Sequence, residues 1–214
     1  MAAITVIGGT GFAGSHIAAA AQRRGNDVTV ISRTAAAEPL PGVTYIQADA
    51  SGSVPAAVSS ADVVVGALSP RAGSEGTLVS TYRSIAAAAA AAGAGLIVIG
   101  GFGSLRPAAG APRFADSGGL PPEFAAEATE LNQVRESLTV DAPAGLSWAF
   151  VSPGAAFGAY VPAQEPRGEY RTSGDVALFD ERGDSSIGGE DFATAVVDLI
   201  DDGDLPNGHV HFAY

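Results

Sequence analysis

The chain has 214 residues, 47% of them hydrophobic, and its 11 basic and 23 acidic residues leave a net charge of −12. This length and apolar content predict a single globular domain, and the acidic balance argues against nucleic-acid backbones and anionic membrane surfaces as partners. Cysteine is absent and all 11 basic residues are arginine. Disulfides, Cys-ligated zinc and every mechanism that needs a lysine ammonium are therefore excluded.

Short β-branched runs alternate with helical stretches along the whole chain. Strands are predicted at 4–7, 27–32, 44–48, 63–67, 96–100, 147–151 and 210–214. Helices are predicted at 13–24, 75–92, 122–138 and 190–201, with a further short helix after the third strand. Continuously apolar strands indicate burial on both faces. The alternation therefore predicts an α/β fold: a Rossmann-type, doubly wound parallel sheet with helices on both faces.

Two long segments rich in glycine and proline interrupt this alternation, at 102–121 and 152–189. They follow the fifth and sixth predicted strands, so they are expected at the carboxyl edge of the sheet, where α/β proteins bind ligands. We expect them to form a small C-terminal lobe on the substrate side of one domain that spans residues 1–214.

No segment reads as a targeting or membrane signal. The first residues carry neither the positive charge nor the long apolar run of a secretory signal. Glycines interrupt the uncharged stretch at 84–105 before it reaches the length of a membrane span. We therefore expect a cytoplasmic protein that does not enter a membrane.

A glycine pattern, G-x-x-G-x-x-G, lies between the first predicted strand and the first helix. Glycines in this position permit a tight turn, let the backbone approach a pyrophosphate and let the helix pack closely on the sheet, while the helix N-terminus offers amide groups to phosphates. The alternative is a tight turn that binds nothing. The pattern predicts an NAD(P)-binding site that includes Gly8, Thr10, Gly11, Phe12, Ala13 and Gly14.

The end of the second predicted strand indicates which dinucleotide is bound. An acidic residue there accepts a hydrogen bond from the ribose of NAD, but this chain has Ser32 and Arg33. Arginine makes charge-assisted, bidentate bonds to phosphate, so NADP(H) is favoured over NAD(H), unless Arg33 is only a solvated loop residue. Asp49 is expected either to accept from the adenine amino group or to cap the next helix. Ala67 and Leu68 are expected to line the adenosine.

Several motifs resemble a known family. They are the glycine turn at 8–14, the loop GGFGSL at 100–105, the strand end at 148–153, the run RGEYR at 167–171 and the segment SIGGEDFA at 186–193. Together they resemble the atypical short-chain dehydrogenase/reductase group over essentially the whole chain. Within it, the chain is similar to the small NADH-flavin reductases, relatives of the biliverdin/flavin reductases and of NmrA-like proteins. The resemblance implies a Rossmann fold with strand order 3-2-1-4-5-6-7 and use of NAD(P)H.

The chain departs from the wider group in its catalytic residues. The Tyr-x-x-x-Lys pair of that group cannot exist without lysine, and no tyrosine precedes Arg135 in the helix that would carry such a pair. Carbonyl reduction needs a proton donor for the developing alkoxide, whereas a flavin ring delocalises the charge and takes its proton from water. We therefore expect an oxidoreductase that transfers hydride to a planar acceptor such as a flavin (FMN or FAD) or a quinone.

The acceptor side offers weaker signals. Ser104 follows the fifth strand and is the candidate catalytic residue, because its hydroxyl can donate or accept; a loop serine that satisfies the backbone is the alternative. Gly101 and Pro153, at the ends of the fifth and sixth strands, are expected beside the nicotinamide. His209 and His211 share one face of the last strand, but no carboxylate completes a ligand set, so no metal site is predicted.

Two other functions stay open. One is a non-catalytic NADP(H)-sensing regulatory protein, which would bind the cofactor and a protein partner without turnover. The other is a nucleotide-sugar epimerase or dehydratase, although such enzymes usually carry a larger C-terminal lobe than 214 residues permit.

Overall fold

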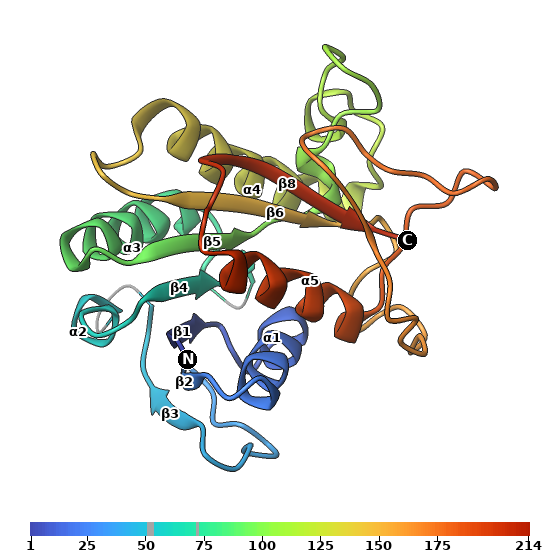
Figure 1. Ribbon diagram of the computed structural model, residues 1–214. Helices are drawn as coiled ribbons and strands as arrows, with labels where there is room; N and C mark the ends of the chain where they lie inside the picture. Colours follow the sequence, from blue (N-terminus) through green and yellow to red (C-terminus); the bar gives the residue numbers. More distant parts are fainter. Residues whose placement is uncertain (51–53, 72) are drawn as a thin grey trace.

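The computed structural model describes residues 1–50, 54–71 and 73–214, in which eight strands form one sheet in the order β3-β2-β1-β4-β5-β6-β8-β7. Figure 1 shows this sheet between two layers of helices. Neighbouring strands are parallel except β7, which runs antiparallel to β8. The strands are β1 (Ala3–Ile7), β2 (Asp27–Ser32), β3 (Thr44–Gln47), β4 (Val63–Gly66), β5 (Gly95–Ile99), β6 (Trp148–Pro153), β7 (Arg171–Ser173) and β8 (Gly208–Ala213).

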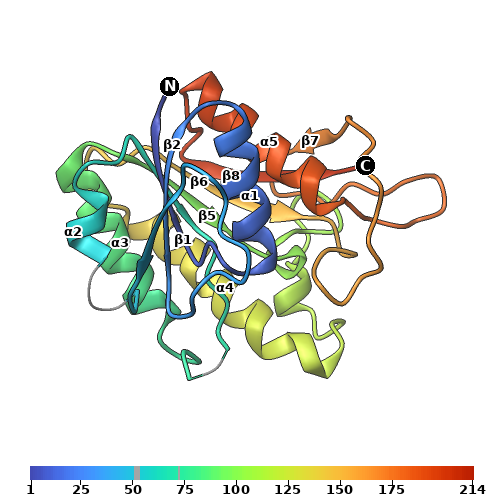
Figure 2. The ribbon, with the colours of Figure 1, turned by 90° about the horizontal axis from the view of Figure 1, so that it is seen from below.

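Helices cover both faces of the sheet. On one face α1 (Phe12–Arg23) packs beside α5 (Gly189–Asp202), as Figure 2 also shows. On the other face lie α2 (Val54–Val58), α3 (Leu78–Ala92) and α4 (Pro122–Asp141). Burial on both faces explains the apolar strands, and all six residues of β6 are buried. None of the helices in the described part of the chain has the length and apolar composition needed to cross a bilayer.

The predicted doubly wound sheet is confirmed, and one strand was missed. The order β3-β2-β1-β4-β5-β6 follows the expected one, and the last predicted strand, β8, lies beside β6. The sequence showed no strand signal in the segment 152–189, but β7 lies within it. A three-residue strand is too short to show an alternating pattern, and β7 is defined by its pairing with Phe212 and Ala213 of β8.

Helix α3 begins three residues later than predicted, at Leu78. Gly76 has a φ of +76°, which ends any helical conformation before it. The amide groups of Gly76 and Leu78 donate to the carboxylate of Glu130 at 3.0 and 2.8 Å. A side chain of α4 therefore caps α3, an arrangement that local sequence cannot indicate.

The two long segments lie together at the carboxyl edge of the sheet. Figure 1 shows both beyond the arrowheads of β5 and β6. The amide of Arg106 donates to the Asp175 carbonyl at 2.8 Å, and the amide of Ala177 donates to the Arg106 carbonyl at 2.9 Å. The first segment also contains two 3₁₀ turns, η1 (Phe102–Ser104) and η2 (Phe114–Asp116).

Candidate functional site

The turn between β1 and α1 has the geometry of a phosphate cradle. Gly8 has a φ of +82°, and a Cβ there would lie 2.4 Å from the carbonyl oxygen of Ala67. A Cβ on Gly14 would lie 2.4 Å from the carbonyl oxygen of Gly8, so α1 approaches the turn closely. Gly11 is the N-cap residue of α1 and has no side chain with which to cap the first amide groups of the helix. These amide groups and the positive end of the helix dipole suit an anion.

A pocket of about 380 Å³ lies at the carboxyl ends of β1, β2 and β4, where the strand order reverses. Open α/β sheets bind their ligands at this switch point. Sequence reasoning missed Thr34 and Thr81, which also line the pocket, because no motif marks them. The predicted cofactor residues that line it are Gly8, Thr10, Gly11, Ser32, Arg33, Asp49, Ala67 and Leu68.

Three hydroxyl groups gather beside Arg33 in this pocket. Thr10 Oγ1 lies 2.5 Å from Ser32 Oγ and 3.2 Å from Thr34 Oγ1. The side-chain amide of Gln47 donates to the Arg33 carbonyl at 3.0 Å and holds this part of the backbone. Hydroxyl groups can turn their protons toward an anionic oxygen, and a guanidinium adds charge. The cluster therefore has the chemistry of a phosphate site.

The opposite wall of the pocket is the loop after β4. Arg71 in this loop forms an ion pair with Glu127 of α4 at 2.7 Å, and Arg33 Nη2 donates to the Arg71 carbonyl at 3.2 Å. The amide of Leu68 donates to the hydroxyl of Tyr82 at 3.2 Å. Burial raises the pKa of Tyr82, so this phenol stays neutral. Contacts from β2, α3 and α4 thus hold the wall in place.

The remaining predicted cofactor residues lie outside the pocket. Phe12, Ala13 and Gly14 are the first three residues of α1, and Gly14 is buried. Gly101 is half-buried at the end of β5, and Pro153 is buried at the end of β6. The structure does not bring these five residues into one cavity with the others, and their contact with a cofactor stays a prediction.

Ser104, the predicted catalytic residue, is fully buried. Its carbonyl accepts a hydrogen bond from Arg113, and its hydroxyl finds no partner within the described part of the chain. An acceptor molecule cannot reach this hydroxyl unless η1 moves. The catalytic role of Ser104 stays a prediction that this arrangement does not favour.

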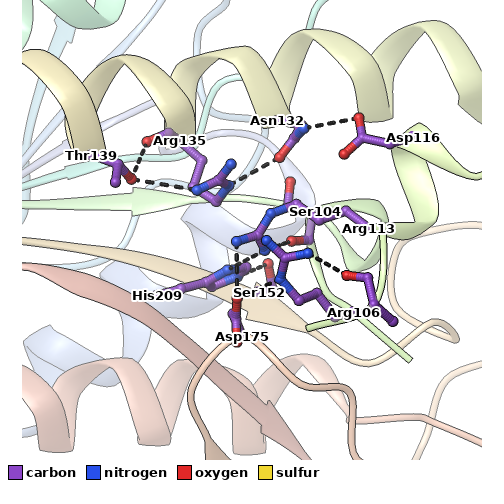
Figure 3. A network of polar contacts seen from close by, with 11 residues as sticks. Ser104, Arg106, Arg113, Asp116, Asn132, Arg135, Thr139, Ser152, Asp175 and His209 are labelled. Atoms are coloured by element: carbon purple, nitrogen blue, oxygen red, sulfur yellow. Dashed lines mark hydrogen bonds and ion pairs between the residues drawn. The ribbon is translucent and has the colours of Figure 1, made fainter. Parts of the chain in front are cut away.

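A polar network surrounds Ser104, as Figure 3 shows. Arg106 Nε and Arg113 Nη2 each donate to Asp175 Oδ2 at 2.9 Å. Arg135 of α4 donates to Asn132 Oδ1 at 3.0 Å. Burial, together with nearby like charge, lowers the pKa of Arg113 and of Arg135. Burial alone would raise the pKa of Asp175, but the hydrogen bond from Arg106 and the two arginine charges hold it below its ordinary value.

His209 extends this network to β6. Its Nε2 lies 2.8 Å from Ser152 Oγ, and Ser152 Oγ donates to the Gly101 carbonyl at 2.8 Å. Burial and the charges of Arg113 and Arg135 lower the pKa of His209 to about 3, so the ring is neutral. Across the described residues, no three metal-ligating side chains gather closely enough to hold an ion.

Aromatic rings line the two long segments. Phe102 stacks on Phe114 with ring centroids 4.7 Å apart, and the edge of Phe179 meets Phe102 at 6.2 Å. Phe124 and Tyr160 form a second pair at 5.6 Å. Phe179 and Tyr160 are 40% and 61% exposed, so flat apolar surface is open to a ligand. Aromatic faces of this kind suit planar molecules.

Asp191 anchors the second long segment to the start of α5. Its carboxylate accepts from the amides of Arg167 and Gly168 at 2.7 and 3.0 Å and from the Tyr214 hydroxyl at 2.5 Å, and it is only 3% exposed. Burial and the bond to Asp191 raise the pKa of Tyr214 to about 12. Asp191, one of the two acidic residues of the SIGGEDFA segment, therefore positions a loop rather than contacting a ligand.

The comparisons with known proteins agree with this geometry. The family described as NAD(P)H-binding matches residues 8–203. The uncharacterized protein YwnB of Bacillus subtilis is 32% identical over 200 residues, which cover 92% of each chain. A Burkholderia pseudomallei structure, described as a suggested exported protein, is 33% identical with a TM-score of 0.85 and full coverage of both chains. A suggested NADH-flavin reductase from Streptococcus pneumoniae is 26% identical with a TM-score of 0.87, covering 100% of this chain and 99% of the other. The chain thus belongs to the NAD(P)H-binding family of Rossmann-fold proteins.

Proposed function

We propose that this protein is an NADPH-dependent reductase that transfers hydride to a planar acceptor of the flavin or quinone type. The observation that carries the proposal is the pocket at the switch point, with its glycine cradle on one side and its hydroxyl and arginine cluster on the other. The similarity to a suggested NADH-flavin reductase supports the reaction class.

The preference for NADPH rests on the end of β2. Thr10, Ser32 and Thr34 place three hydroxyls together, and Arg33 follows directly. A 2′-phosphate at this position gains charge-assisted hydrogen bonds, whereas the ribose hydroxyl of NADH meets no carboxylate at the end of β2. Asp49 also lines the pocket, and its carboxylate suits the adenine amino group.

The acceptor class rests on what the two long segments present. Flat aromatic surface at Phe102, Phe114 and Phe179 suits a ring system that lies against the nicotinamide. When bound, the cofactor supplies the hydride. The protein's contribution is then to hold two planar rings in contact, because a flavin or quinone acceptor takes its proton from water and needs no Tyr–Lys pair.

Cofactor binding tests the first half of the proposal. The melting temperature and the dissociation constants of NADPH and NADH are measured for the wild type and for Arg33→Ala, with the exposed Arg23→Ala as the matched control. We expect Arg33→Ala to weaken NADPH about 10- to 100-fold, as the loss of a charged hydrogen bond predicts, and to leave NADH unchanged. Equal effects on both dinucleotides would refute the phosphate role of Arg33.

Turnover tests the second half. NADPH oxidation is followed with FMN, FAD, a benzoquinone and a naphthoquinone, and with an aldehyde as the acceptor that needs a proton donor. We expect the planar acceptors to be reduced and the aldehyde to be inert. Binding of NADPH without turnover of any acceptor would contradict the reductase and favour the sensing alternative, which predicts a protein partner whose affinity changes with NADPH.

A further inference from the structure

The network behind η1 fixes the direction of a chain of hydrogen bonds that ends at Gly101. The Gly101 carbonyl can only accept, and Ser152 Oγ lies 2.8 Å from it, so the single proton of this hydroxyl points to Gly101. His209 Nε2 lies 2.8 Å from the same hydroxyl. Because that hydroxyl has no second proton to give, Nε2 must carry a proton and donate to it.

The other nitrogen of His209 gives an independent check. Nδ1 lies 3.5 Å from Arg113 Nη1, a long contact, and an arginine nitrogen only donates. An unprotonated Nδ1 is therefore the form that suits this neighbour. Both sides of the ring select the same neutral Nε2–H tautomer, and the hydrogen bonds run from Arg113 to His209, to Ser152 and to Gly101.

Burial and the charges of Arg113 and Arg135 lower the pKa of His209 and keep its ring neutral, while the charge of Asp175 opposes them. Arg113 reaches it from the first long segment, Arg135 faces it from α4, and Asp175 approaches from the second long segment. The edge of the ring meets Phe150 of β6 at 5.1 Å. His211, two residues along β8, is also neutral and has the opposite tautomer, because its Nδ1 lies 2.9 Å from the Ser152 carbonyl and must donate to it.

The chain of hydrogen bonds holds η1 at both ends. The Gly101 carbonyl accepts from Ser152 and also from the Ser104 amide at 3.2 Å, which closes the turn. Arg113 binds the Ser104 carbonyl at the other end. Phe102 lies between these two points and stacks on Phe114.

We propose that His209 is a positioning residue of the reductase, acting through Ser152 as its Nε2–H tautomer to hold Gly101 and, with it, the aromatic face of Phe102. This inference rests on the proposed function for its effect on catalysis. The tautomer and the rigidity of η1 do not depend on that function.

Nitrogen-15 NMR of the histidine rings tests the tautomer in the whole chain. We expect His209 to show a protonated Nε2 and an unprotonated Nδ1, and His211 to show the reverse, which makes it an internal reference. A protonated Nδ1 on His209 would overturn the proposal.

A double-mutant cycle tests whether His209 acts through Ser152. His209→Leu and Ser152→Ala are each expected to lower kcat about 10-fold, the value of one hydrogen bond, while the KM for NADPH stays within about twofold. The double variant is expected to be no worse than either single one, and His209→Gln, which keeps a donor, to restore most of kcat. Independent effects that multiply to about 100-fold, or an effect on KM alone, would overturn it.

Hydrogen exchange of the Ser104 amide keeps the test independent of catalysis. Both single variants are expected to speed this exchange about 10-fold and equally, since Ser152→Ala removes the hydroxyl that donates to the Gly101 carbonyl and His209→Leu removes the N–H that holds this hydroxyl in place. Thr5→Val is the control, because it removes another buried hydroxyl far from η1. Thr5 lies on β1, and its hydroxyl donates to the carbonyl of Ala57 on α2 at 3.4 Å. If no acceptor is reduced but exchange responds as expected, the proposed function fails and the positioning of η1 stands. If exchange is unchanged, the positioning role fails.

Discussion

Gly14→Ala tests how closely α1 approaches the glycine turn that follows β1. Two effects of opposite sign on the free energy of unfolding act at this position. Gly14 lies within a helix, and alanine is the better helix former by about 1 kcal/mol. A Cβ on Gly14, however, would lie 2.4 Å from the Gly8 carbonyl oxygen and 2.8 Å from Gly9 Cα. Both atoms belong to the main chain and cannot turn aside as the tip of a side chain can.

The sizes of the two effects decide whether Gly14→Ala stabilises or destabilises the protein. The Gly8 carbonyl accepts the Gly11 amide at 3.0 Å, so displacing it also weakens the turn. Overpacking costs about 1–3 kcal/mol, and the strained hydrogen bond adds about 1 kcal/mol. After subtraction of the helix gain, we expect the free energy of unfolding to fall by about 2 kcal/mol, which lowers the melting temperature by roughly 4–8 °C in a domain of this size.

Calorimetry without cofactor measures this effect, and Gly11→Ala is the matched control. A Cβ on Gly11 would meet nothing closer than 3.3 Å, and its φ of −77° is open to any residue. Its expected loss is within about 1 kcal/mol, the difference between glycine and alanine as an N-cap. If Gly14→Ala unfolds at or above the wild-type temperature, the close approach of α1 to the turn is refuted.

Two further predictions concern stability. Asp191→Asn removes a charge that accepts three hydrogen bonds, so we expect the free energy of unfolding in urea to fall by about 2 kcal/mol. The control is the exposed Asp201→Asn, for which we expect a fall of less than about 1 kcal/mol. Equal losses would contradict the anchoring role. His209 is neutral in the folded state and protonates near pH 6.5 in the unfolded state. Its contribution to the free energy of unfolding is therefore complete above pH 6.5 and falls by about 2 kcal/mol by pH 5. The lowered pKa of His211 makes the free energy of unfolding fall further over the same range. His209→Gln is expected to flatten the slope, and an unchanged slope would show that His209 is charged. Asp175 contributes in the same direction but at lower pH: its pKa is also lowered in the folded state, so its stabilisation is present above 3.8 and is lost as pH falls through the folded-state value below 3.8.

The sheet could be predicted from the sequence because each strand is marked by a local residue pattern, and the pattern recurs along the chain. Short runs rich in β-branched residues marked six of the parallel strands and the position of β8, and glycine marked the end of α3 at Gly93. Two features depend on partners that are far away in the chain. Strand β7 exists only through its pairing with β8, and the start of α3 depends on Glu130.

The pocket at the switch point could be predicted for the same reason, and the surroundings of Ser104 could not. The glycine turn and Arg33 each follow a strand directly, so their positions in the sequence predict that they lie at the carboxyl edge of the sheet. The network around η1 joins Arg113 to Asp175 across 62 residues and Ser152 to His209 across 57. Ser104 was singled out for its position after β5, but burial by these distant partners closes its hydroxyl to an acceptor.

The use of arginine alone for positive charge has a structural consequence at η1. Arg113 donates at once to the Ser104 carbonyl, to Asp175 and toward His209, and these partners lie in different directions. A planar guanidinium with five fixed donors meets all three, while the three donors of a lysine sit on one nitrogen at the end of a flexible stem. Arg113 therefore couples the first long segment, the second long segment and β8 through one side chain. This coupling holds η1, and with it the aromatic ring of Phe102, against two other parts of the fold.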